Sequence, residues 1–352
     1  MLSQRTCFLD EIEEQADALR LVTTYYAREG KNLLQEAAAL CRPQGNGRLI
    51  LTGMGTSYYV ATAFYKLLAD LGKRLPIAFE AGELLHHGLG GIAPDDVIVA
   101  ISQSGESYEV VRLVEALGEH RVLAITNQSG SALARAAQLT LPICSGHEET
   151  ISNKSYTNSM AVLLLLAKAI AREDAGQLYA SLAHCAAEMD AFLARRTDEI
   201  VAAAGFLHEA QFLYFVSRGS AMIAAYQAAL TWNEGSHIPT TALPGGSFRH
   251  GPFELARAGF HAVFFIPQGA SGGLLEEMAY EVAGYGGRVL AFSGRGMRSA
   301  ENLHVIELAP GEEDLFSLAT AVPQELLLAR MAQDRGVVAG VFERGGKVTR
   351  RE

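Results

Sequence analysis

Short apolar runs alternate with helical patterns along most of the chain. Residues 49–51, 76–79, 97–101 and 121–126 are apolar runs of strand length. After residue 107, apolar side chains at 110, 113, 114 and 117 follow the i, i+3, i+4, i+7 spacing of a helix. Further helices are expected at 58–71, at 178–194, from residue 152 through 170, and as two helices within 8–41. Strands that alternate with helices favour parallel sheets with helices on both faces.

The second half of the chain repeats the pattern of the first. Residues 212–216 and 263–266 are again strand-like, and a third run ends at 293. Gly55 and Ser104 are 49 positions apart (104 − 55), and Gly219 and Gln268 are also 49 apart (268 − 219). Equal spacing of like elements indicates a duplication. The fold class predicted is therefore α/β, with two doubly wound domains, each a parallel sheet with helices on both faces.

The turn at 102–107 is the strongest candidate for a binding site. An apolar strand stops at Ser102, and Ser104 and Ser107 follow directly before the helix. Hydroxyls and unpaired amides at a helix N-terminus favour an anion. The turn contains no lysine and no P-loop pattern, so it suits a sugar phosphate better than a nucleoside triphosphate. A plain serine-rich helix cap remains the alternative.

The corresponding turn in the second half, residues 267–272, lacks these serines. We therefore expect one phosphate site per chain, located in the first half. The second half would supply other chemistry. Its candidates are Glu234, in a helix from 222 to about 233 that should break near Gly235, and His250, in a polar loop at 247–252. A carboxylate can move a proton between sugar carbons, and a histidine can assist ring opening. The alternatives are a surface carboxylate and a structural loop histidine.

Composition excludes several classes of protein. The net charge is −10 over 352 residues without a basic run, which argues against nucleic acid or an anionic membrane as partner. The longest apolar run, 160–167, is too short to span a bilayer. The first residues do not resemble a signal peptide. The four cysteines lack metal spacing and are expected to be reduced thiols in the cytoplasm. We expect no metal and no cofactor.

Four motifs together resemble the tandem sugar-isomerase (SIS) domains of the isomerase half of glucosamine-6-phosphate synthase and its relatives. They are Gly55-Thr56-Ser57, the turn at 102–107, Ser152-Asn153-Lys154, and Arg249-His250-Gly251-Pro252. The resemblance extends from the acidic residues 11–15 to residues 347–349. It implies an N-terminal helical segment at 1–45, SIS domains at 46–195 and 196–335, and a C-terminal tail at 336–352 that closes over the site.

The resemblance also assigns roles to individual residues. Glu234 would move the proton between C1 and C2, His250 from the partner subunit would help to open the ring, and Lys347 would close over the substrate. A homodimer is therefore expected. The substrate and its phosphate would be held by residues from the first half: Gly55, Thr56, Ser57, Ser102, Gln103, Ser104, Ser107 and Ser152.

Three departures from the synthases narrow the expected function. The chain begins directly at the SIS region, Thr231 stands where synthases have a lysine three residues before the base, and Lys347 is placed one residue later. The ending Gly346-Lys347-Val348-Thr349 is more similar to that of stand-alone amino-sugar phosphate deaminases and deglycases. We expect deamination of a hexosamine 6-phosphate or cleavage of a fructosyl-amine 6-phosphate. The alternatives are simple aldose–ketose isomerisation and a non-catalytic module that senses sugar phosphates.

Overall fold

A computed structural model describes residues 5–42, 45–70, 76–195, 197–309 and 311–349. The chain packs into two compact units. The N-terminal unit comprises Asp17–Glu148, Ser152–His184 and Phe342–Glu352, and the C-terminal unit comprises Met1–Ala16, Glu149–Ile151 and Cys185–Val341. The predicted domain boundaries at 45, 195 and 335 remain predictions.

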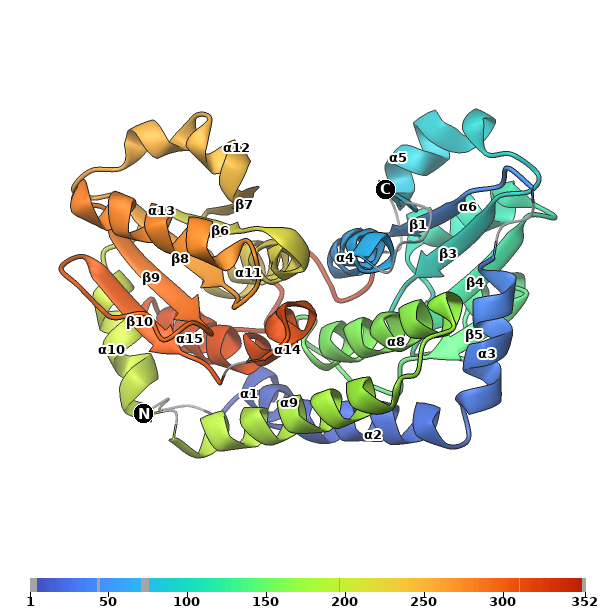
Figure 1. Cartoon of the computed structure of the whole chain (residues 1–352), viewed down its shortest axis with the longest axis horizontal. Helices are drawn as coiled ribbons and strands as arrows, with labels where there is room; N and C mark the ends of the chain where they lie inside the picture. Colours follow the sequence, from blue (N-terminus) through green and yellow to red (C-terminus); the bar gives the residue numbers. More distant parts are fainter. Residues whose placement is uncertain (1–4, 43–44, 71–75, 196, 310, 350–352) are drawn as a thin grey trace. The chain divides into compact units, whose positions relative to one another are not determined.

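The N-terminal unit is built on a five-stranded parallel sheet in the order β2-β1-β3-β4-β5 (Figure 1). Every residue of β1 and β3 is buried, which explains why these strands are continuous apolar runs and do not alternate. The strands are β1 Leu49–Gly53, β2 Ile77–Glu80, β3 Val97–Ile101, β4 Arg121–Thr126 and β5 Leu139–Pro142.

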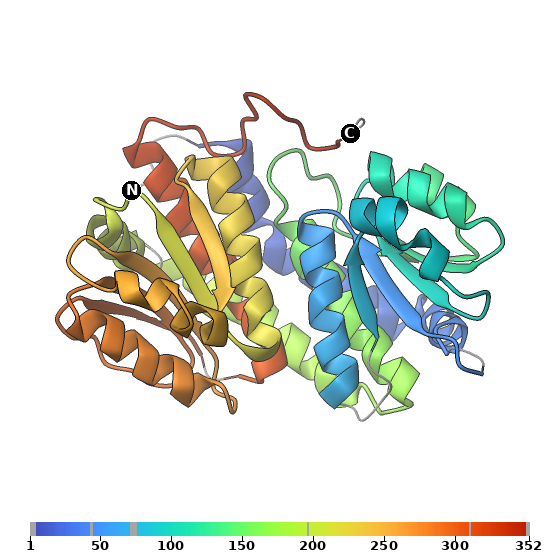
Figure 2. The ribbon, with the colours of Figure 1, turned by 90° about the horizontal axis from the view of Figure 1, so that it is seen from above.

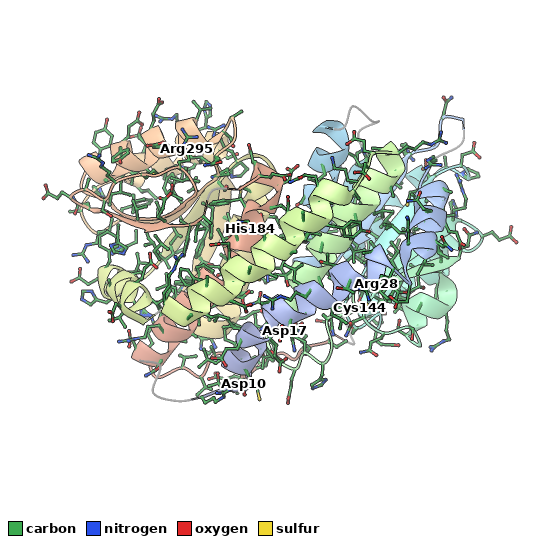
Figure 3. The ribbon with its side chains drawn as sticks, turned by 60° about the horizontal axis from the view of Figure 1, so that its bottom comes forward. Asp10, Asp17, Arg28, Cys144, His184 and Arg295 are labelled. Atoms are coloured by element: carbon green, nitrogen blue, oxygen red, sulfur yellow. The ribbon has the colours of Figure 1, made fainter. Side chains whose placement is uncertain are left out.

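Helices cover both faces of this sheet. Ile50, Ile98 and Val122 form a core with Val110 and Leu113 of α6 on one face, and helix α4 packs against β1 and α8. Figure 3 shows the outer side of α2, with Asp17 exposed in its first turn and Arg28 exposed directly after its last residue. The helices of this unit are α2 Gln15–Ala27 (Asp17 onward), α3 Lys31–Leu40, α4 Thr56–Asp70, α5 Ala81–Glu83, π-helix η1 Leu84–Gly88, 3₁₀-helix η2 Leu89–Gly91, α6 Tyr108–Leu117, α7 Ala132–Ala136, α8 Lys154–Ala171 and α9 Gly176–Arg195 (to His184).

The C-terminal unit repeats this topology with the order β10-β9-β8-β6-β7, again all parallel. One face of the sheet buries Phe248, Phe260 and Phe264 together with Leu275 and Met278 of α13. On the other, α11 packs beside α15 (Figure 2, in yellow and red). The strands are β6 Leu213–Ser217, β7 Thr240–Pro244, β8 His261–Ile266, β9 Arg288–Ser293 and β10 Leu303–Glu307.

The C-terminal unit contains both α-helices and short 3₁₀-helices. They are α1 Cys7–Glu13, α10 Thr197–Leu207, 3₁₀-helix η3 Gly219–Ala221, α11 Met222–Ser236, α12 Gly245–Arg249, 3₁₀-helix η4 Pro252–Leu255, α13 Gly272–Gly284, 3₁₀-helix η5 Glu313–Leu315, α14 Phe316–Ala319 and α15 Ala321–Asp334.

The structure confirms the predicted fold class, two parallel α/β sheets covered by helices, and corrects three local predictions. The stretch 8–41 forms three helices instead of two, because the first helix ends at Glu13. Helix α11 continues through Gly235 and ends at Ser236, where His237 adopts φ +53°. Residues 245–249 form the short helix α12, so only part of 247–252 is a loop. The expected last helical residue, Leu71, lies outside the described residues.

Candidate active site

The candidate site of the N-terminal unit lies where the strand order reverses. Strand β1 pairs with β2 on one side and β3 on the other, so the connections from β1 and β3 leave in opposite directions. In open parallel sheets, ligands bind at the carboxyl ends of the strands at such a switch point. The segments that follow β1 and β3 are residues 54–57 and 102–107, and they contain seven of the eight predicted phosphate and substrate residues.

In the serine turn, defined here as Ser102–Ser107, the hydroxyl oxygens of Ser102 and Ser104 accept hydrogen bonds from amides of the turn itself. Ser102 Oγ accepts a hydrogen bond from the Gly105 amide at 3.1 Å and lies 3.2 Å from Ser107 Oγ. Ser104 Oγ accepts from the Glu106 amide, also at 3.1 Å. An oxygen that accepts a backbone N–H still has its own proton to donate. The turn therefore presents hydroxyl donors, which an anion can accept.

Ser107 precedes helix α6 but does not cap it. It is the N-cap residue by position, with φ −60° and ψ 126°, and its side chain makes no capping hydrogen bond. A serine N-cap normally binds the second or third amide of its helix. Ser107 therefore does not form the serine helix cap that was considered as the alternative.

Gly105 makes the turn sterically possible. Its φ is +63°, and a Cβ there would collide with the side chain of Ser131. Its carbonyl accepts from the Leu133 amide at 3.0 Å, and the neighbouring Gln103 carbonyl accepts from Asn127 at 3.0 Å. The serine turn is therefore fixed to the segments that follow β4.

The predicted residues after β1 begin helix α4. Gly55 has φ +50°, and Thr56 and Ser57 are the first two residues of the helix. Gly53 permits this close packing, because a Cβ there would lie 2.9 Å from both the Ile101 carbonyl and Ser57. Two helix N-termini, those of α4 and α6, thus follow adjacent strands of one sheet.

Ser152 lies in the turn before α8, and Glu148 fixes that turn. Glu148 Oε1 accepts from the amides of Asn153 (3.0 Å) and Ser155 (2.8 Å), and Oε2 accepts from Ser155 Oγ (2.6 Å). The Lys347 ammonium forms an ion pair with the same Oε2. The structure therefore brings the predicted tail lysine to the loop that contains Ser152.

The tail has a second contact in the same unit. The Tyr108 amide, the first of helix α6, donates to the Thr349 carbonyl at 3.0 Å. The tail thus reaches the residue that directly follows the serine turn. The sequence did not indicate Glu148 or Tyr108 as site residues. The pair Glu148–Lys347 is separated by 199 positions, so no local pattern could have identified it.

Glu234 lies in the C-terminal unit, near the end of α11, and its side chain is partly exposed. The same helix is bound to α15 through Trp232, whose indole N–H donates to Gln324 Oε1 at 3.1 Å. Thr231 is fully buried and donates to the Gln227 carbonyl at 3.0 Å. The position three residues before Glu234 is therefore occupied by a neutral side chain with its hydrogen bond made inside the helix.

His250 is exposed directly after α12. Phe248, fully buried, fixes this segment in the aromatic core, and its ring lies about 6 Å from those of Tyr214 and Phe253. Arg249 binds Glu281 at 2.6 Å. The histidine is thus presented to solvent from a well-anchored segment. Ser102–Ser107 and His250 lie in different units.

In the C-terminal unit, the counterpart of the serine turn is residues 267–272, and the carboxylate of Glu313 from η5 binds there. Glu313 Oε1 accepts from Ser271 Oγ at 3.1 Å. A Cβ on Gly219 would lie 2.5 Å from Glu313 Oε1, and one on Gly269 would collide with the same carboxylate. Gly219 follows β6 and Gly269 follows β8, the two strands at this sheet's switch point. The second turn is thus occupied by the Glu313 carboxylate.

Within the described residues, no group of three or more His, Cys, Asp or Glu side chains could hold a metal ion. No helix in this part of the chain is long and apolar enough to cross a membrane. Cys41 and Cys185 are buried free thiols, and burial raises the pKa of each to about 12.

Comparison with known proteins confirms the resemblance. The family profile described as the SIS domain matches residues 44–169. The glutamine–fructose-6-phosphate aminotransferase [isomerizing] of Aeropyrum pernix is 30% identical over 345 aligned positions, with 93% of this chain and 54% of the relative covered. The enzyme of the same name from Bacillus subtilis is 28% identical, with 93% and 55% covered. The chain spans about half the length of these curated relatives.

Solved structures share the fold. The C-terminal domain of glucosamine-fructose-6-phosphate aminotransferase from Francisella tularensis has a TM-score of 0.86 at 21% identity, covering 96% of this chain and 98% of that one. Glucosamine-6-phosphate deaminase from Thermotoga maritima has a TM-score of 0.74 at 21% identity, with 95% and 96% covered. At these identities the likeness shows a common fold and leaves the reaction open.

Proposed function

We propose that this chain, which contains a SIS domain at residues 44–169 and is homologous to glutamine–fructose-6-phosphate aminotransferases over 93% of its length, is a phosphosugar isomerase. Its substrate would be an amino-sugar 6-phosphate, converted by proton transfer between C1 and C2 with loss of the amine. Deamination of a hexosamine 6-phosphate and cleavage of a fructosyl-amine 6-phosphate both fit this chemistry.

The observation that carries the proposal is the serine turn. Ser104 accepts the Glu106 amide and keeps its own proton for a ligand. The Ser102 and Ser107 hydroxyls share one hydrogen bond, which leaves one proton between them, and the Ser107 side chain makes no capping bond to its helix. Together with the positive end of the α6 dipole, these donors suit a phosphate monoester. Thr56 and Ser57 begin the helix that follows the adjacent strand, so we assign them, with Gly55 and Gln103, to the same phosphate.

For the chemical step we propose Glu234 as the base that carries the proton and His250 as the group that assists ring opening. The exposure of His250 on an anchored segment supports its use by a second subunit, because an exposed side chain is accessible to a partner. Ser152 and Lys347 would contact the sugar. A phosphate tether favours such a reaction because it fixes the reacting carbons at small entropic cost.

The test is a substrate screen with matched variants. Parental protein is incubated with glucosamine 6-phosphate and with fructosyl-amino-acid 6-phosphates, and release of ammonia or amino acid is measured together with ketose formation. We expect amine release from one class. Ketose formation without amine release would indicate a simple isomerase. Binding without any turnover would indicate a sensor, and no binding would refute the proposal.

Two variants test the assigned roles. Ser104→Ala with Ser107→Ala should raise KM by roughly 10²- to 10⁴-fold, since each hydrogen bond to a charged group contributes about 1.5–3 kcal/mol. Ser271→Ala, in the counterpart turn, is the matched control and should leave KM nearly unchanged. Glu234→Gln should lower kcat by about 10²- to 10⁴-fold and abolish exchange of the C2 proton with deuterated solvent. Retained exchange would mean that another group is the base.

A further inference from the structure

We propose that Glu148 is a positioning residue: its buried carboxylate fixes the Lys347 ammonium relative to the turn that contains Ser152. The inference rests on the proposed function, in which Lys347 and Ser152 contact the sugar. It adds a residue that neither the motifs nor the comparisons point to, and every contact that supports it lies within the N-terminal unit.

The burial of Glu148 shows that its charge is compensated inside the protein. Its side chain is 0% exposed in the ion pair with Lys347, whose own side chain is 18% exposed. A buried carboxylate is strongly destabilising unless it is paired and hydrogen-bonded. Among the described residues, Glu148 accepts from two backbone amides, the Ser155 hydroxyl and the Lys347 ammonium.

The two oxygens of Glu148 have different partners. Oε1 accepts from two backbone amides, those of Asn153 and Ser155 around the start of α8. These bonds set the orientation of the carboxylate, because backbone amides at a helix start are fixed by the helix. Oε2 then points to where the Lys347 ammonium sits. The position of the lysine is therefore defined by the same residues that define the Ser152 turn.

The tail is also held two residues beyond the lysine. The Thr349 carbonyl accepts from the Tyr108 amide at the start of α6. The backbone bond and the Glu148–Lys347 ion pair together fix the course of the tail, and the direction of the lysine side chain depends on Glu148. An ammonium has three N–H donors, so binding one carboxylate oxygen leaves donors for a sugar oxygen.

Glu11 offers a matched comparison. It is also buried, and it accepts from the Glu149 amide at 2.5 Å and from the Thr150 amide and hydroxyl. It belongs to the C-terminal unit and has no lysine among its described hydrogen-bond partners. A variant of Glu11 therefore removes a buried carboxylate of α1 that binds the next two residues of the same loop, Glu149 and Thr150, and leaves the Lys347 ion pair in place.

A double-mutant cycle tests whether Glu148 acts through Lys347. Glu148→Gln should lower kcat by about 10- to 100-fold, the scale expected when a reacting group is displaced by about 1 Å, with KM changed less than about threefold. In the Lys347→Ala background, Glu148→Gln should lower kcat no further. Glu11→Gln should instead lower kcat by the same factor in both backgrounds. Glu148→Asp, which keeps the charge, should recover part of kcat and guards against misfolding of the Gln variant.

Equal effects of Glu148→Gln with and without Lys347 would overturn the inference while leaving the proposed function intact. A measurement that does not depend on catalysis distinguishes failure of this inference from failure of the proposed function. Hydrogen exchange of the Tyr108 amide should be slow in the parental protein and faster in Glu148→Gln, but unchanged in Glu11→Gln. Unchanged exchange in Glu148→Gln would overturn the inference even if no substrate were ever found.

Discussion

Replacing Gly105 by alanine should both destabilise the N-terminal unit and disable the serine turn. The residue has φ +63°, a conformation that costs a non-glycine residue about 1–2 kcal/mol. The new Cβ would also collide with Ser131 Oγ and lie 2.5 Å from Ser131 Cβ. Ser131 caps α7 by accepting from the Ala134 amide, and loss of such a cap costs about 1 kcal/mol. We expect a total loss of about 2–4 kcal/mol in the free energy of unfolding.

Gly146→Ala is the control for this measurement. Gly146 lies in the same unit and has φ +69°, but no atom lies within 4 Å of where its Cβ would be. Urea unfolding of the two variants should therefore differ by about 1 kcal/mol or more, the part due to the collision. Gly105→Ala combined with Ser131→Gly should remove the collision. The reasoning is wrong if Gly105→Ala and Gly146→Ala lose equal stability and bind a phosphate ester equally well.

The C-terminal unit should lose stability in acid because burial is the main cause that lowers the pKa of both His261 and His304. Stability is fully present above the ordinary histidine pKa of about 6.5 and falls below it, because the unfolded chain then binds protons that the folded chain excludes. Thermal unfolding between pH 7.5 and 5 should show this loss, and a smaller one in His261→Gln. A second prediction concerns assembly: inactive Glu234→Gln and inactive His250→Ala subunits should regain activity when mixed, because a hybrid dimer contains one complete site. Failure to regain activity despite proven subunit exchange would place both residues in the same chain's site.

The elements that could be predicted from sequence are those whose burial leaves an unambiguous pattern. Strands β3 and β4 are buried almost throughout, and both were predicted with the observed bounds. Strands β5, β7 and β10, at three of the four sheet edges, were not predicted, because they are partly exposed and polar residues or proline interrupt their apolar residues. Their apolar signal is weaker, and their pairing depends on a neighbour distant in sequence. The fourth edge strand, β2, is also partly exposed, but its apolar run was recognised.

The site was predictable where its residues follow a strand directly, as in the serine turn. Its internal hydrogen bonds span only two to five positions. Glu148 could not be predicted, because its role depends on Lys347 in the distant tail. The predicted end of α11 was wrong for a similar reason. A glycine often marks the end of a helix, but Gly235 lies within α11, where it packs against Ile151 and Leu328 and a larger residue would not fit.

Because Glu313 occupies the turn of the C-terminal unit, the two repeats differ in whether the anion at the switch point belongs to the chain or is a bound ligand. In the C-terminal unit the negative charge at the switch point is covalently supplied and present at every ligand concentration. On the proposed function, the N-terminal unit must obtain its charge from a bound metabolite. Ligand that binds only the folded state stabilises it in proportion to the logarithm of its concentration. The stability of the C-terminal unit would then not depend on ligand, whereas the stability of the N-terminal unit would rise with the concentration of the phosphorylated sugar.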